Sequence, residues 1–170
     1  MRRHLSMLAA VVSLLIALTS CRSAAPSADY QALARAGIRL GVDIDYDDDR
    51  LLYVTAAGWV GVPYRYGGES KRGVDCSGFV RAICRTVYGK EVSRTADEQY
   101  KSDCRRVRRS KLREGDLVFF KNARRSRKAS HVGIYLKDNK FIHASNSGVI
   151  VSDLGEPYYD KTWLGAGRLK

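Results

Sequence analysis

Two short segments, residues 131–136 and 141–145, constrain the fold more than any other feature of this chain. In both, apolar residues alternate with other residues, as in β-strands that bury one face. Lys137-Asp138-Asn139 between them suits a three-residue hairpin loop, with Leu136 opposite Lys140. In this register one face carries Val132, Ile134, Leu136, Ile142 and Ala144. We therefore expect an antiparallel hairpin whose apolar face packs on a helix.

The other face of this hairpin would carry His131 and His143, the two histidines that follow His4 in the chain. His143 would lie opposite Gly133, and Ser145 opposite His131, so that the imidazoles are diagonal neighbours roughly 5–8 Å apart. Gly133 would leave room for a ring to lie across it. A slip of one residue would move the two rings to opposite faces. The register that buries the apolar residues therefore also pairs the histidines.

Helical patterns precede the strands. Acidic residues ahead of Leu51 favour a helix over about 49–61, and a glycine-rich loop follows at 61–68. A third helix is predicted to open at Thr95, where Thr95 and Glu98 form a capping box. Between these two, an apolar helical stripe from Cys76 to Gly89 consists of Phe79, Val80, Ile83 and Val87. Strands are predicted at 116–120, 131–136, 141–145, 149–154 and 163–169, and this order of elements indicates an α+β domain with an antiparallel meander.

The N-terminus has the features of an export signal. Arg2 and Arg3 precede an apolar run, Leu5–Leu18, which is short for a membrane span. The following Leu18-Thr-Ser-Cys21 resembles a bacterial lipobox, so we expect 1–20 to be a lipoprotein signal peptide and Cys21 to be the lipidated first residue. An uncleaved anchor and an ordinary signal are the alternatives. Residues 21–48 would then be a tether and N-terminal segment, and 49–170 the catalytic domain.

The chain is strongly basic, with 30 Lys and Arg against 18 Asp and Glu and a net charge of +12. Removal of Arg2 and Arg3 with the leader lowers this charge to +10. Such a charge favours an anionic partner: nucleic acid, an acidic membrane surface or the cell wall. Export removes nucleic acid from this set, so we expect a location in the cell envelope, anchored to a bacterial membrane by lipid.

Cys76 is the candidate nucleophile. It lies where a loop becomes a helix, and the positive end of the helix is expected to lower the pKa of its thiol. Gly78 would keep the approach to the sulfur open. Together with His131 as base and His143 as a ring that orients the base, Cys76 would complete a catalytic triad. If Cys76 is considered without the histidines, a small buried core residue is the simpler interpretation. For Cys84 we keep that interpretation.

A zinc site with an open position is the competing interpretation of the same three residues. No acidic or cysteine ligand is evident near them in the sequence, so neither a metal nor a cofactor is expected. Cys84 and Cys104 complete an odd set of three thiols after Cys21, which is typical of an exported protein with at least one free thiol.

Five motifs resemble those of the NlpC-type cell-wall cysteine peptidases, over residues 51–169. They are Tyr64-Arg-Tyr-Gly-Gly68, Asp75-Cys76-Ser77-Gly78-Phe79-Val80, Gly115-Asp-Leu-Val-Phe-Phe120, His131-Val-Gly-Ile-Tyr135 and Phe141-Ile-His-Ala-Ser145. A single such domain behind a lipobox is similar to the murein endopeptidase lipoproteins of that family. The resemblance implies a papain-like α+β fold in which helices pack on an antiparallel sheet.

The resemblance also implies roles for individual residues. Cys76 would be the nucleophile, His131 the general base and His143 the residue that orients it. Tyr64 would reach the catalytic centre, where its hydroxyl could join the Cys76 backbone N–H in the oxyanion hole. Asp75 and Ser77 would line the substrate pocket, where a carboxylate could hold a substrate ammonium group; helix capping is the alternative role for these two.

The expected function is hydrolysis of peptide bonds in peptidoglycan stem peptides or cross-links by a monomeric enzyme. The absence of a second domain in the sequence favours cleavage of the D-Ala–diamino acid cross-link over the γ-D-glutamyl–diamino acid bond. Two alternatives stay open. One is a non-catalytic, wall-binding lipoprotein of the same fold, and the other is an amidase or acyltransferase that acts on another amide.

Overall fold

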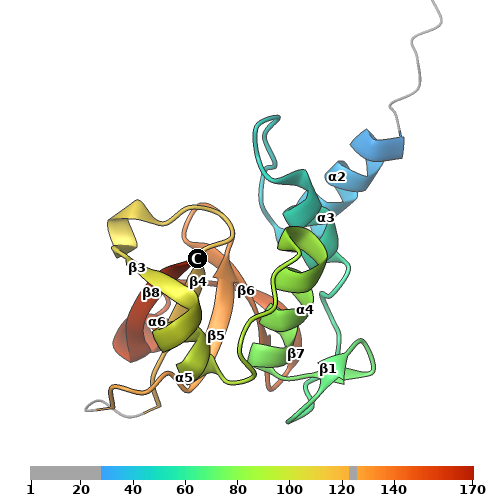
Figure 1. Ribbon diagram of the computed structural model, residues 1–170. Helices are drawn as coiled ribbons and strands as arrows, with labels where there is room; N and C mark the ends of the chain where they lie inside the picture. The colour runs from blue at the N-terminus through green and yellow to red at the C-terminus, as the bar shows by residue number, and fades with distance from the viewer. Residues whose placement is uncertain (1–27, 123–125) are drawn as a thin grey trace, which may run out of the picture. The chain divides into compact units, whose positions relative to one another are not determined.

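The computed structural model describes residues 28–122 and 126–170. The predicted signal peptide, the predicted lipidation site Cys21 and residues 22–27 of the predicted tether and N-terminal segment therefore lie outside the described residues. The chain forms two units, 1–31 and 32–170, and the first is described here only for its last four residues, the start of helix α2 (Ala28–Leu40). The sheet and the helices that follow α2 belong to the second unit, and Figure 1 shows their arrangement.

The helices begin and end at residues suited to those positions. Helix α3 (Arg50–Ala57) starts after Asp49, whose side chain accepts a hydrogen bond from the Leu52 N–H, and it ends four residues before the predicted Gly61. Helix α4 (Cys76–Tyr88) stops at Gly89, which has the left-handed conformation that glycine adopts without strain. The remaining helical segments are α5 (Ala96–Glu98), a π-helical turn (Gln99–Asp103), a 3-10 turn (Arg109–Lys111) and α6 (Pro157–Thr162).

The predicted capping box is half formed. The Thr95 hydroxyl accepts a hydrogen bond from the Glu98 N–H, as expected. The Glu98 carboxylate, however, accepts its bond from the Thr95 hydroxyl, at 2.8 Å, and not from the Thr95 backbone. The helix that begins here is correspondingly short, and it turns directly into the π-helical segment.

In the part of the chain that the structure describes, six strands form one antiparallel sheet in the order β3-β8-β4-β5-β6-β7. They are β3 (Cys104–Val107), β4 (Leu117–Phe120), β5 (His131–Tyr135), β6 (Lys140–Ser145), β7 (Gly148–Asp153) and β8 (Trp163–Leu169). The meander from β4 to β7 is as predicted. Strand β8 returns to pair with β4, and β3, at the edge of the sheet, pairs with β8. A separate two-stranded hairpin, β1 (Glu69–Ser70) and β2 (Gly73–Val74), precedes α4.

The predicted register of the β5–β6 hairpin is confirmed. Ile134 pairs with Ile142 and Tyr135 with Phe141, and the Leu136 N–H donates to the Lys140 carbonyl. Gly133 lies where a Cβ atom would come within 2.7 Å of the Phe141 ring and 3.0 Å of the His143 Cβ. Any larger residue would therefore separate the two strands at this point.

The sheet buries side chains on both faces. Helix α4 packs on β5 and β6, and α3 packs on α4, as Figure 1 shows with these helices beside the sheet. The main core lies between them and includes the predicted apolar face of the hairpin. A second cluster of buried residues contains three aromatic rings. Its members are Val118, Phe120, Phe141, Leu154, Tyr159 and Ala166. His143 stacks on Phe141 of this second cluster, so the histidines belong to the aromatic side of the sheet.

Candidate active site

Cys76 is the first residue of α4 and follows a tightly bonded N-cap, Asp75. One carboxylate oxygen of Asp75 accepts from the Gly78 N–H at 2.7 Å, and the other accepts from the Gly67 N–H at 2.9 Å. A cap of this kind contributes about 1 kcal/mol to a helix. The carboxylate thus fixes both the first turn of α4 and the loop that approaches it, which sets the position of Cys76.

Gly78 has a packing role that was not predicted. A Cβ atom at this position would come within 2.3 Å of the Gly68 carbonyl oxygen, because the loop before β1 packs directly against the first turn of α4. The glycine is therefore required for backbone packing beside Cys76. That it also opens the approach to the sulfur stays a prediction.

Arg94 neutralises Asp75, and sequence reasoning missed it. Its guanidinium donates to both carboxylate oxygens, at 3.0 and 2.6 Å, and to the Ser77 hydroxyl at 2.8 Å. Burial raises the pKa of Asp75, whereas the hydrogen bonds from Arg94, Gly78 and Gly67 lower it. The hydrogen bonds have the larger combined effect, so the pKa of Asp75 is below its usual value. No sequence signal distinguishes Arg94 among 30 Lys and Arg residues.

A cleft of about 400 Å³ opens beside Cys76. The three predicted pocket residues Tyr64, Asp75 and Ser77 line it together with Cys76. Ala129 and Ser130, which directly precede His131, also line the cleft. The Ala129 N–H donates a hydrogen bond to the Asp97 carboxylate at 3.0 Å. The structure thus brings the predicted substrate-pocket residues and the candidate nucleophile to one open surface.

Tyr64 lies in this cleft at the start of the segment that leads to Cys76, and its backbone forms an isolated bridge with Val74. Burial, together with the charges of Cys76 and Asp75, raises the pKa of its phenol. The hydroxyl is therefore protonated at neutral pH and available as a hydrogen-bond donor, the state that an oxyanion-hole role requires.

The Cys76 thiol lies against the first residues of β5. Burial raises the pKa of this thiol; hydrogen bonds from the backbone N–H of Val132, of Ser77 and of Cys76 itself act in the opposite direction. Burial has the larger effect, so the predicted net lowering of the pKa by the helix terminus is wrong. Val132 directly follows His131, which places the sulfur beside the strand end that carries the candidate base.

The two histidines form a direct hydrogen bond. The distance from His131 Nε2 to His143 Nδ1 is 2.8 Å, and the rings are nearly perpendicular, with centroids 4.9 Å apart. This bond uses Nε2 of His131 and leaves its Nδ1 as the nitrogen available to a thiol. The two nitrogens face each other, whereas two metal ligands would direct their nitrogens toward a common point.

Burial lowers the pKa of both rings, to about 4 for His131 and to about 3 for His143, where the neighbouring His131 adds to the effect. Both imidazoles are therefore neutral at neutral pH. A neutral ring can accept a proton, which is the state required of a general base. Transfer of the thiol proton to His131 would create two opposite charges, each of which reduces the burial penalty of the other.

Two hydroxyl groups beyond His143 were not predicted as part of the site. Ser152 Oγ lies 3.1 Å and the Tyr159 hydroxyl 3.2 Å from His143 Nε2. Ser152 is on β7, diagonal to His143, and the alternation of that strand could have placed it on the same face. Tyr159 comes from α6, a short helix without a clear sequence signal.

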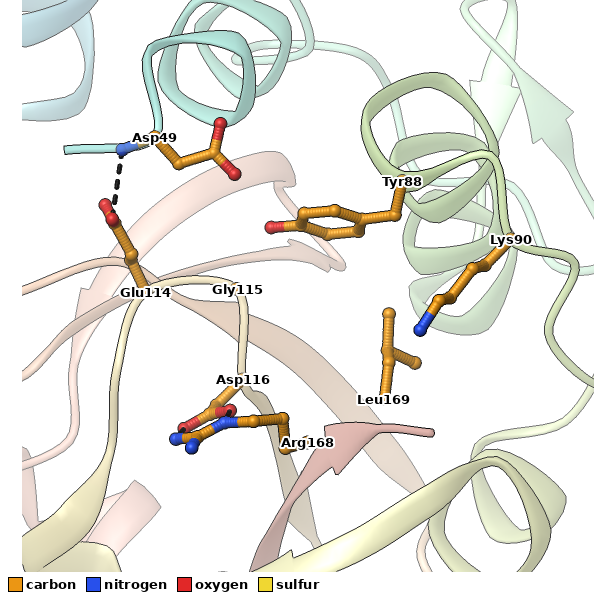
Figure 2. A pocket seen from close by; sticks show the side chains of 8 residues that line it. All are labelled: Asp49, Tyr88, Lys90, Glu114, Gly115, Asp116, Arg168 and Leu169. Atoms are coloured by element: carbon orange, nitrogen blue, oxygen red, sulfur yellow. Dashed lines mark hydrogen bonds and ion pairs between the residues drawn. The ribbon is translucent and has the colours of Figure 1, made fainter.

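A second pocket contains charged side chains but neither a cysteine nor a histidine in its lining (Figure 2). Arg168 forms a bidentate pair with Asp116, with both distances 2.7 Å, and Glu114 accepts a hydrogen bond from the Asp49 N–H at 2.9 Å. These contacts connect the start of β4 to the end of β8 and to the start of α3. They stabilise the fold.

Within residues 28–122 and 126–170, no group of three or more His, Cys, Asp and Glu side chains is arranged to hold a metal ion. Over the same residues, every helix is too short or too polar to cross a bilayer.

Comparison with known proteins relates the whole arrangement to one family. Residues 61–168 match the model of the NlpC/P60 family. The chain is 47% identical over 114 residues to murein DD-endopeptidase MepS/murein LD-carboxypeptidase of Escherichia coli K12, covering 66% of this chain and 58% of that protein. It is 44% identical over 112 residues to the probable endopeptidase NlpC of the same strain, covering 65% of this chain and 71% of that one.

A solved structure agrees. The crystal structure of an NlpC/P60 family protein from Bacillus cereus superposes with a TM-score of 0.66 at 30% identity, covering 75% of this chain and 42% of the other. The family's α+β fold, with helices on an antiparallel sheet, is therefore the fold of this chain. The chain spans little more than half the length of the first of these relatives.

Proposed function

We propose, on the premise that this chain belongs to the NlpC/P60 family, that it is a cysteine peptidase that hydrolyses peptide bonds in peptidoglycan. The observation that carries the proposal is the arrangement of Cys76 at the start of α4 beside β5, with His131 bonded to His143 at 2.8 Å. The name of the murein endopeptidase relative supports peptidoglycan as the substrate. The mature net charge of +10 suits an anionic polymer.

The catalytic cycle follows from the atoms available. Nδ1 of His131 takes the thiol proton, and the Cys76 sulfur attacks the carbonyl carbon of the scissile amide. The backbone N–H of Cys76 and the Tyr64 hydroxyl stabilise the oxyanion. His131 then donates its proton to the leaving amine as the C–N bond breaks. Water, deprotonated by His131, hydrolyses the thioester and restores the thiol.

Asp75 contributes to this function through structure more than through charge. Its two oxygens are already bonded to Arg94, Gly78 and Gly67, so we do not assign it a substrate ammonium group. Ser77 is similarly engaged with Asp75 and Arg94. These residues hold the floor of the cleft, and Tyr64 is the pocket residue whose hydroxyl is available to a substrate.

Purified sacculi provide the direct test. The protein should release muropeptides whose masses identify the bond that is cut; we expect cleavage of the D-Ala–diamino acid cross-link. A Cys76→Ala variant should bind sacculi but release nothing. If the unmutated protein binds sacculi without releasing peptides, the non-catalytic alternative is correct. If the products carry a new acyl or amide group in place of a free carboxylate, the acyltransferase alternative is correct.

We further propose that Cys21 is acylated and anchors a monomeric enzyme to a membrane of the cell envelope. The motif Leu18–Cys21 after a short apolar run supports this proposal. Intact-mass analysis of detergent-extracted protein should show a diacylglyceryl group on an N-terminal Cys21, and sedimentation should give the mass of one chain. A mature chain that begins at another residue would refute the anchor.

A further inference from the structure

His143 is the central ring of a longer hydrogen-bonded chain. On one side its Nδ1 meets His131 Nε2 at 2.8 Å, and on the other its Nε2 meets Ser152 Oγ at 3.1 Å and the Tyr159 hydroxyl at 3.2 Å. The Ser152 hydroxyl in turn donates to the Tyr159 oxygen at 3.4 Å. The side chain of His143 is 1% exposed, so these hydroxyls stand in the place that water would take at a surface.

Two proton arrangements are compatible with the bond between the histidines. In the first, Nε2–H of His131 donates to Nδ1 of His143, and Nε2–H of His143 donates onward to the hydroxyl oxygens. In the second, a hydroxyl donates to Nε2 of His143, and Nδ1–H of His143 donates to Nε2 of His131. The first leaves Nδ1 of His131 bare and able to accept the thiol proton. The second places a proton on Nδ1 of His131 and blocks it.

The two oxygens at Nε2 favour the first arrangement. One N–H can be shared between two acceptors at 3.1 and 3.2 Å. A single nitrogen lone pair accepts one O–H in the ring plane, so in the second arrangement the other oxygen would face the nitrogen with no hydrogen between them. In the first arrangement the Ser152 hydroxyl can also donate to the Tyr159 oxygen, at 3.4 Å, while its own oxygen accepts from His143.

Packing holds both hydroxyls in place. The Tyr159 ring lies edge-on to Phe141, with centroids 4.8 Å apart, and beside Phe120, at 5.2 Å. Helix α6, which carries Tyr159, is tied down by Arg109, whose guanidinium pairs with Asp160 and donates to the Leu154 carbonyl. Ser152 is fixed by the β6–β7 register, in which it pairs with Phe141.

We infer that Ser152 and Tyr159 are positioning residues that accept the Nε2 proton of His143 and thereby keep Nδ1 of His131 free to take the Cys76 proton. They act through the two rings and do not touch the substrate. This inference deepens the proposed function and rests on it for its catalytic consequence, but the proton positions that it assigns can be measured without any substrate.

The test is imidazole NMR of mature protein labelled with ¹⁵N-histidine. The mature chain holds two histidines, because His4 lies in the leader, so each of the four ring nitrogens can be assigned. Near neutral pH, Nε2 of both rings should be protonated and Nδ1 of both should be bare. Ser152→Ala and Tyr159→Phe should each show a mixture of tautomers, since the remaining hydroxyl can then donate as well as accept.

The double variant Ser152→Ala/Tyr159→Phe should shift furthest toward the blocked tautomer, because a bare buried acceptor is tolerated better than an unpaired N–H. Its kcat should fall by roughly 10–100-fold, the usual range for loss of an orienting partner, with little change in KM. Ser152→Thr/Tyr159→Phe restores one hydroxyl and should recover most of the kcat. Tyr158→Phe is the matched control, since Tyr158 is 66% exposed, and it should change neither quantity.

Unchanged tautomers in both single variants would overturn the inference, and this outcome can be read even if the double variant does not fold. A loss of kcat with tautomers unchanged would also overturn it, because the hydroxyls would then act through packing alone. If the tautomers shift as expected but the unmutated protein hydrolyses no wall peptide, the positioning role stands and the proposed function falls.

Discussion

Two aspartate–arginine pairs, Asp75–Arg94 and Asp116–Arg168, are both bidentate and both involve a buried aspartate, but they differ in what surrounds them. Each aspartate is at most 6% exposed, is held at both oxygens by one guanidinium and accepts at least one backbone N–H. The first lies directly before Cys76 in the cleft. The second lines the pocket of Figure 2, among Asp49, Tyr88 and Glu114. A charged pocket therefore does not by itself indicate a site.

What separates the two regions is the proposed nucleophile, Cys76, and the hydrogen-bonded histidine pair near it. In the cleft, the ion pair fixes the helix terminus that bears the thiol. In the second pocket, the same kind of pair fixes the junction of β4 and β8. Both pairs stabilise the fold, and the first also fixes the start of the helix that carries Cys76.

The largest expected difference comes from removing the nucleophile. Cys76→Ala should lower muropeptide release by at least about 10⁴-fold, because Cys76 is the one thiol among the described residues that line the cleft. Tyr88→Phe, a comparable deletion of one polar atom in the second pocket, should leave turnover within about 2-fold, as expected away from the reacting atoms. Rates on purified muropeptides check both. Substantial activity in Cys76→Ala would show that Cys76 is not the nucleophile.

Matched aspartate substitutions should separate structural from catalytic effects. Asp75→Asn and Asp116→Asn should each lower the free energy of unfolding by roughly 1–3 kcal/mol, because charge-assisted hydrogen bonds weaken while the arginines, 34% and 39% exposed, remain solvated. Turnover should fall by up to about 100-fold in Asp75→Asn, since displacement of the helix start misplaces the thiol. It should be nearly unchanged in Asp116→Asn.

Urea unfolding and steady-state kinetics on the same preparations give the two numbers. Equal losses of turnover in both variants would show that the cleft pair has no special relation to Cys76. A loss of turnover in Asp116→Asn without loss of stability would assign the second pocket a part in the reaction.

The histidine pair should dominate the pH dependence of stability in mildly acidic solution. Folding lowers the pKa of His131 from 6.5 to about 4 and that of His143 from 6.5 to about 3, by burial. The unfolded chain therefore binds more protons below pH 6.5, and stability is complete above that value and declines as pH falls toward 4. Each ring contributes a slope of up to about 1.4 kcal/mol per pH unit.

Asp75 responds in a different range, because its lowered pKa means that the stability it provides is lost only at more acidic pH. Urea unfolding from pH 8 to 4 gives the slope of the unfolding free energy against pH. This slope should be nearly the same in Asp75→Asn as in the unmutated protein. In His143→Gln it should be smaller by the contribution of one proton, about 1.4 kcal/mol per pH unit. A flat profile between pH 6.5 and 4 would mean that the rings are charged in the folded state.

The smallest effect is expected at the two remaining thiols. Burial raises the pKa of Cys84 and of Cys104 to about 12, and both are free and buried in the fold. Brief iodoacetamide treatment should therefore modify Cys76, which borders the cleft, before either of them, and activity should be lost in step with that single modification. Peptide mapping identifies the labelled residue. Prior labelling of Cys84 or Cys104 with activity retained would show that the nucleophile is wrongly assigned.

Local patterns were sufficient for much of the site. The alternation around the 137–139 loop predicted a register that the structure confirms, and with it the contact between His131 and His143. The helical stripe after Cys76 and its end at Gly89 were predicted in the same way. The edge strand β3 was not predicted as a strand, because its run of basic residues lacks apolar alternation and its pairing with β8 spans some sixty residues of chain.

The sequence by itself determined which residues share a face or begin a helix, since periodicity and capping depend on neighbours a few residues away. It therefore placed Cys76 at a helix start and both imidazoles on one side of a hairpin. Only the tertiary structure decided what those groups experience. Arg94 reaches Asp75 across 19 positions, Tyr159 reaches His143 across 16, and burial raises the pKa of the thiol although the helix start alone would lower it. Solvent exclusion and long-range contacts arise from packing, which no local pattern encodes.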